Sequence, residues 1–103
     1  MTKKQSTKPV ESALKVFKTL DVLTHNFATG YSPAELMKAT NQSGAAITRH
    51  LKTLIEVGYA EQIPDTGRYR PSHRYAQHAV SIMRSLDKAK QQAEQSLARI
   101  TRF

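Results

Sequence analysis

Arginines gather in one short polar stretch of this chain. In the segment IPDTGRYRPSHR, residues 63–74, Arg68, Arg70 and Arg74 fall within seven positions that contain no acidic residue. A guanidinium group pairs with phosphate oxygens through two parallel hydrogen bonds, so this residue type at this density suits the binding of a polyanion. We predict that the three arginines contact the phosphate backbone or an adjacent minor groove of DNA.

A second group of candidate contacts lies upstream, on the predicted helix GAAITRHLKTLIEVG, residues 44–58. Its apolar stripe, expected to be buried, consists of Ile47, Leu51, Leu54 and Ile55. The expected DNA contacts at its N-terminus and on its opposite face are Ser43, Gly44, Ala45, Thr48, Arg49 and Lys52. Gly44 and Ala45 let the first turn approach the floor of a groove, and Arg49 can pair with guanine. A solvated helix face without a ligand has the same pattern, so this helix alone leaves both interpretations open.

Two shorter signals predict the helices that must position this one. Apolar residues recur at spacings of three and four over residues 10–25, which predicts a first helix. Its apolar stripe consists of Val10, Ala13, Leu14, Val16, Phe17, Leu20, Val22 and Leu23. Phe27, in the break that follows, is expected to fill the core. Ser32 and Glu35 have the spacing of a capping box, which predicts a second helix over residues 33–39 before the turn NQSG.

A β-hairpin is predicted after the third helix. Residues 59–63 alternate in the manner of a strand, residues 64–67 form a turn, and residues 68–71 alternate again. If Tyr69 points into the core, Arg68 and Arg70 both point to the other face. The predicted fold is mainly α with a small β-hairpin: a winged helix-turn-helix with a three-helix head and a two-stranded wing. A solubilising hairpin edge, protected by charge from strand pairing, is the alternative.

Composition agrees with a nucleic-acid partner. The chain has 103 residues, 16 Lys and Arg against 8 Asp and Glu, a formal net charge of +8 and a pI near 10.1. Such a balance favours double-stranded DNA over an anionic membrane surface, and no membrane partner is predicted. The sequence has no cysteine, no long apolar run and no apolar segment at its N-terminus, so we expect a cytoplasmic protein without disulfides.

Motifs for catalysis or metal binding are missing from the sequence. The four histidines include no helical i, i+4 pair, and no paired-carboxylate, nucleophile-elbow or phosphate-loop motif is present. His50 is expected to border the core. We therefore predict that the protein is not an enzyme and has no catalytic residue, metal site or cofactor.

The stretch from Val10 to about Ala79 resembles the N-terminal DNA-binding domain of the IclR family of bacterial transcription regulators. The matching pieces are SAL at 12–14, VF at 16–17, Leu20, SPAEL at 32–36, ITRHLKTL at 47–54, GY at 58–59 and PDTGRYR at 64–70. The resemblance implies that the helix over residues 44–58 enters the major groove and that the wing touches the backbone. It also implies that two copies bind an operator as a dimer.

Two features depart from the family pattern. Family members usually carry a small-molecule-sensing domain after the winged helix, and this sequence ends at Phe103. Gly44, Ala45 and Ala46 also replace a polar residue followed by serine and threonine, and His50 occupies a usually apolar position. We expect the activity of the protein to be regulated by its abundance, by proteolysis or by a protein partner. The operator sequence of this chain cannot be taken from the family.

The last 28 residues, 76–103, are predicted to form one long helix with a narrow apolar seam. Two interleaved seven-residue repeats define it, Ala79, Leu86, Ala93 and Ile100 with Ile82, Ala89, Ser96 and Phe103. The predicted dimerisation residues are Ala79, Ile82, Leu86, Ala89, Ala93, Ile100 and Phe103. In two copies paired along this seam, the two helices over residues 44–58 would be placed to enter successive major grooves, about 34 to 36 Å apart. Folding of the helix back onto its own head is the alternative.

These observations predict three regions and one function. Residues 1–8 form a flexible basic arm, residues 9–75 the DNA-binding domain and residues 76–103 the dimerisation helix. The predicted function is a sequence-specific double-stranded DNA-binding transcription regulator, a repressor acting as a homodimer. A winged-helix protein–protein adaptor and a nonspecific nucleic-acid binder are the alternatives.

Overall fold

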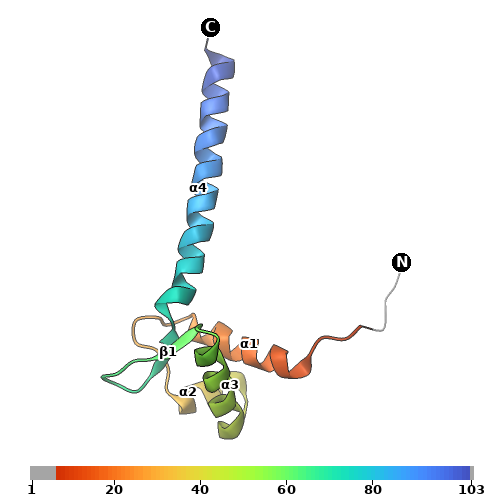
Figure 1. The fold of residues 1–103 in the computed structure, drawn as a ribbon, viewed down its shortest axis with the longest axis vertical. Helices are drawn as coiled ribbons and strands as arrows, with labels where there is room; N and C mark the ends of the chain where they lie inside the picture. Colours follow the sequence, from red (N-terminus) through yellow and green to blue (C-terminus); the bar gives the residue numbers. More distant parts are fainter. Residues whose placement is uncertain (1–6, 103) are drawn as a thin grey trace. The chain divides into compact units, whose positions relative to one another are not determined.

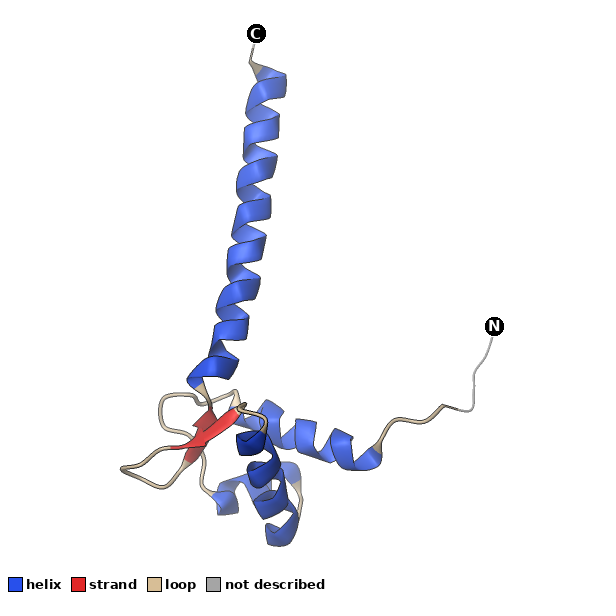
Figure 2. Ribbon diagram, viewed as in Figure 1, coloured by secondary structure: helices blue, strands red, loops and turns tan. Residues whose placement is uncertain are grey.

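The computed structural model describes residues 7–102 and contains four helices and two strands in this part of the chain (Figures 1 and 2). They are α1 (Glu11–Leu23), α2 (Pro33–Thr40), α3 (Gly44–Glu56), β1 (Ala60–Gln62), β2 (Tyr69–Pro71) and α4 (His73–Thr101). The order of elements is the one that the sequence predicted. Contacts divide the chain into two units, with the boundary between Ser72 and His73.

The turn between α2 and α3 is fixed by its capping residues. At the start of α2, the Ser32 hydroxyl accepts a hydrogen bond from the Glu35 amide at 3.2 Å, and Glu35 Oε1 accepts one from the Ser32 amide at 3.0 Å. The predicted capping box is therefore confirmed. Asn41 ends α2 in the left-handed region, with φ 54°, a conformation that asparagine tolerates better than most residues. Two residues later, the Ser43 hydroxyl caps α3 by accepting from the Ala46 amide at 3.1 Å.

The core of the first unit lies where α1, α2, α3 and the hairpin meet. α1 packs against α2, α3 and β2, and α2 packs against α3. The buried apolar residues are Leu20, Leu23, Leu36, Ile47, Leu51, Leu54 and Ala60. Three helices of 13, 8 and 13 residues thus share one small core.

Several apolar residues predicted to be buried are exposed instead. Val10, Leu14 and Phe17 are exposed by 65%, 45% and 59%, because the core covers only the C-terminal part of α1, where Thr19, Leu20 and Leu23 are buried. Ile55 is 43% exposed on the flank of α3. Phe27 is 36% exposed, so the prediction that it fills the core is wrong. The apolar stripes are wider than the surfaces that the small core can cover.

The hairpin gains a third partner that the sequence pattern did not reveal. β1 and β2 pair antiparallel, with Glu61 opposite Arg70, and Tyr31 forms an isolated bridge to Tyr69 on the other side of β2. The two tyrosine backbones exchange two hydrogen bonds of 2.8 Å each. Gly30, with φ 74°, allows this approach, since a Cβ there would lie 2.5 Å from the Tyr69 carbonyl oxygen. The wing is therefore joined through the backbone to the segment that enters α2.

The second unit is the helix α4. It has 29 residues and begins at His73, three residues before the predicted start at residue 76. None of its residues is buried. Its exposed large apolar residues are Val80, Ile82, Met83, Leu86, Leu97 and Ile100. Within the described residues, no helix has the length and apolar character needed to cross a membrane. Phe103 and residues 1–6 of the predicted arm lie outside the described residues.

Candidate nucleic-acid interface

The outward face of α3 is open to solvent. Ala45, Arg49 and Lys52 are exposed, whereas Ile47 and Leu54 on the opposite side are buried. Each cation is carried on a helix whose other side is anchored in the core, so its backbone position is fixed while its side chain reaches outward. A rigid helix with a small residue in its first turn and cations behind it has the shape and charge required to enter a DNA groove.

The polar residues at the start of α3 have local partners. The Ser43 hydroxyl caps the helix, and the Thr48 hydroxyl donates to the Gly44 carbonyl at 2.9 Å. Both residues are exposed. Gly44 is half-buried, and a Cβ at this position would lie 3.5 Å from Met37 Sδ in α2. Gly44 therefore faces α2, and of the two small residues expected to permit a close approach to DNA only Ala45 lies on the outward face.

Arg68 is held within the domain. Its Nε donates to the Thr29 carbonyl at 3.2 Å, its Nη2 donates to the Gly30 carbonyl at 2.9 Å, and Nη2 also pairs with Glu35 Oε1. Three acceptors from the loop before α2 and from α2 itself therefore fix this guanidinium group. Glu35 links the wing to the start of α2, because the Oε1 that pairs with Arg68 also accepts from the Ser32 amide.

Arg70 is also engaged. Its Nε donates to Glu61 Oε2 on the paired strand at 2.9 Å, and its guanidinium carbon lies 5.2 Å from the centre of the Phe27 ring. A cation over an aromatic face is attracted by the ring quadrupole, which accounts for the position of Phe27 outside the core. Arg68 and Arg70 both lie against residues 27–35. Both side chains are therefore paired within the domain, and their contact with DNA stays a prediction.

Hydrogen bonds keep Glu35 ionised. The Ser32 backbone amide makes the largest contribution to lowering the pKa of this carboxyl below its usual 4.5, and Arg68 lowers it further. Burial acts in the opposite direction and is outweighed. The charge that caps α2 and pairs with the wing is therefore present at neutral pH.

The remaining cations define where an anion can bind. The wing tip exposes Pro64, Asp65 and Thr66 and thus carries a negative rather than a positive charge. Arg74 lies in the first turn of α4 and not in the hairpin, because the helix begins earlier than predicted. Within the described part of the first unit, the exposed cations outside the two ion pairs are Lys8, Lys15, Lys18, Lys38, Arg49 and Lys52.

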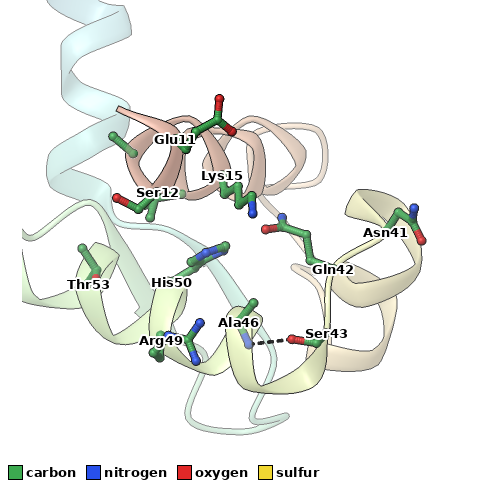
Figure 3. A pocket seen from close by; sticks show the side chains of 12 residues that line it. Glu11, Ser12, Lys15, Asn41, Gln42, Ser43, Ala46, Arg49, His50 and Thr53 are labelled. Atoms are coloured by element: carbon green, nitrogen blue, oxygen red, sulfur yellow. Dashed lines mark hydrogen bonds between the residues drawn. The ribbon is translucent and has the colours of Figure 1, made fainter. Parts of the chain in front are cut away.

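A groove of about 950 Å³ lies between α1, the α2–α3 turn and α3 (Figure 3). His50 is 7% exposed at its floor, and His50 Nδ1 lies 2.9 Å from Thr19 Oγ1, which also accepts from Gln42 Nε2 at 3.3 Å. Burial makes the largest contribution to lowering the pKa of His50 below 6.5, followed by the charges of Arg49 and Lys15. The imidazole is therefore neutral at pH 7. The sequence placed His50 at the core edge but gave no sign of its partners in α1 and the turn.

In the part of the chain that the structure describes, no group of three or more His, Asp or Glu side chains could hold a metal ion.

No protein-family model and no curated protein matches this sequence. Among solved structures, the crystal structure of HmgR from Pseudomonas aeruginosa is similar, with a TM-score of 0.66 and 22% sequence identity. The chain shares its winged-helix fold. The match covers 89% of this chain and 40% of HmgR, so the chain spans less than half the length of that protein. The predicted fold class, three helices, a hairpin and a long C-terminal helix, is confirmed.

Proposed function

We propose that this protein is a sequence-specific regulator of transcription that binds double-stranded DNA through α3. The observation that carries the proposal is the outward face of α3, where Ala45, Arg49 and Lys52 are exposed opposite a buried apolar side. The net charge of +8 and the winged-helix fold shared with HmgR support the same function.

In this proposal the DNA contacts are divided among the elements. Ala45, Thr48 and Arg49 meet base edges, since they occupy the first half of a helix that would enter the major groove. Lys52 and the exposed Lys38 of α2 contact phosphates and supply affinity without sequence preference. Arg68 and Arg70 act mainly within the domain, because Arg68 pairs with Glu35 of α2, while Arg70 pairs with Glu61 of β1 and lies over the Phe27 ring.

We further propose a homodimer formed through α4. The seam residues Ala79, Ile82, Leu86, Ala89, Ala93 and Ile100 are all exposed, which supports a surface that a second copy covers. A helix of this length is about 44 Å long, enough to present several layers of side chains to its partner. A protein that represses by occluding a promoter needs no activating surface, so repression is the simplest form of the proposal. We propose that this repressor is cytoplasmic and is controlled by its abundance or by a protein partner.

The test is selection from a random pool of duplex DNA by the purified protein at about 150 mM salt, near physiological ionic strength. We expect enrichment of an inverted repeat with half-site centres about 10 base pairs apart, the spacing that suits a symmetric dimer. A pool that is retained without enrichment would indicate a nonspecific nucleic-acid binder. A pool that is not retained would favour the protein–protein adaptor.

Salt dependence separates the adaptor from the DNA binder. If the dimer neutralises about six to ten phosphates, the logarithm of the association constant should fall with the logarithm of salt concentration with a slope of roughly −5 to −9. Fluorescence anisotropy of a labelled duplex at several salt concentrations measures this slope. A nearly flat dependence would contradict DNA binding through basic residues.

A further inference from the structure

The groove beside α3 combines a buried imidazole with two cations from different helices. His50 forms part of the floor, Lys15 comes from α1, and Arg49 comes from α3. Figure 3 shows Lys15, Gln42 and His50 pointing into the same space between α1 and α3. Because His50 Nδ1 is bonded to Thr19 Oγ1, the nitrogen left to meet a ligand is Nε2.

The charges around His50 come from both helices. Lys15 and Glu11 of α1 and Arg49 of α3 line the groove, and the lining residues of the α2–α3 turn are uncharged. Two cations against one carboxylate leave this space positive and suited to an anion. Gln42 Oε1 is buried without a hydrogen-bond partner among the described residues. Half a turn of this amide would put its NH2 donor where the oxygen now lies, so that an anion could accept from it, and the Thr19 hydroxyl, which now accepts from Nε2, would then donate to the amide oxygen.

We propose that this groove binds one phosphate group, held by Lys15 with the charge of Arg49 at its edge, and that binding adds a proton from solvent to His50 Nε2. The phosphate diester of DNA and free inorganic phosphate share the required chemistry. For the DNA source, the inference rests on the proposed function of α3. The inference also gives a role to His50, which lies on the floor of the groove beside the outward face of α3.

Proton uptake follows from what surrounds the imidazole. Three causes lower the pKa of His50 in the free protein, and two of them are the charges of Arg49 and Lys15. An anion that pairs with these cations cancels their repulsion and attracts the imidazolium, so the pKa of His50 rises when the groove is filled. Protonation also turns Nε2 from an acceptor into a donor, which an anionic oxygen can accept.

A fall in pH acts differently on the stability of the free protein and on its affinity for an anion. In the free protein the depressed pKa of His50 supports folding above pH 6.5, and this stability is lost as the pH falls below 6.5. In the complex the proton favours the bound anion, so affinity rises as the pH falls from 8 toward 6. Uptake of one proton limits the gain to about tenfold per pH unit.

The experiment combines two measurements on the full chain. NMR titration of the His50 imidazole, with and without inorganic phosphate, measures its pKa directly. Calorimetric titration of a duplex into the protein, in two buffers of different ionisation enthalpy, counts the protons taken up. The test variant is His50→Gln, whose amide can still donate to Thr19, and the control is His25→Gln, at the exposed end of α1 and outside the groove.

We expect phosphate to raise the pKa of His50, and duplex binding to take up protons in the wild type and in His25→Gln but not in His50→Gln. A pKa of His50 that neither phosphate nor duplex changes would overturn the inference, and this measurement needs no variant to fold. Duplex binding without proton uptake would sink the inference and leave the proposed function intact. A pKa raised by phosphate in a protein that binds no duplex would support the groove and contradict the proposed function.

Discussion

Thr19 lies at the centre of the hydrogen bonds that join α1 to α3 and to the turn before it. Its side chain is fully buried, and Oγ1 meets His50 Nδ1 at 2.9 Å and Gln42 Nε2 at 3.3 Å. The same hydroxyl lies 3.3 Å from the Lys15 carbonyl, to which it donates. The substitution Thr19→Val keeps the shape of this side chain and removes the oxygen that all three groups share.

The expected cost comes mainly from His50. Its Nδ1 would be left inside the domain without a partner, and an unsatisfied buried polar group costs about 1 to 3 kcal/mol. Gln42 is only half-buried and can turn toward water, so it adds little. The extra methyl group of valine returns up to about 0.8 kcal/mol through burial. With a cost in the middle of that range, about 2 kcal/mol, the free energy of unfolding should therefore fall by about 1 kcal/mol, a large share for a small domain.

Urea denaturation followed by circular dichroism measures this loss. The matched control is Thr24→Val, since the Thr24 hydroxyl is exposed and bonds only to the Asp21 carbonyl, and it should change stability by less than about 0.5 kcal/mol. In Thr19→Val/His50→Leu both polar partners are gone, so the double variant should lose less than the sum of the single losses. Equal stability of Thr19→Val and wild type, or strict additivity, would refute this account of the groove floor.

Three further predictions concern the wing, the contacts with DNA and the dimer. Gly30→Ala should lower the free energy of unfolding by more than about 1 kcal/mol, because φ is 74° and the new Cβ would meet the Tyr69 carbonyl; an unchanged urea midpoint would contradict this. Arg49→Ala should relax sequence preference at one or two base pairs, while Lys52→Ala should weaken binding to all sequences alike; identical selection profiles for the two would refute the division. Leu86→Glu should convert the proposed dimer to a monomer in analytical ultracentrifugation, and an unchanged mass would place the dimer contact elsewhere.

Local signals account for the parts of the fold that the sequence predicted. The capping box at Ser32 and Glu35 and the spacing of Ile47 and Leu51 each act within a few residues of chain. Their outcome depends little on what packs nearby, so the helices appear at or within a few residues of their predicted bounds. Alternation around Tyr69 likewise predicted the hairpin.

Contacts between distant segments account for what could not be predicted. Alternation put Arg68 and Arg70 on one face, but nothing in the spacing showed that residues 27–35 cover that face. Phe27 looked like a core residue because it is aromatic, and it instead stacks beneath a guanidinium group. A surplus of positive charge predicts an anionic partner. Tertiary structure decides which of the cations are already paired with carboxylates inside the protein.

The central claim is that the outward face of α3 contacts DNA. The most direct measurement is the change in backbone amide chemical shifts when a duplex from the selected pool is added to the isotope-labelled protein. The account predicts the largest changes at Ala45, Thr48, Arg49 and Lys52, with smaller ones at the wing and at Lys38 in α2. Shifts confined to α4, or no shifts at a concentration that saturates binding, would contradict it.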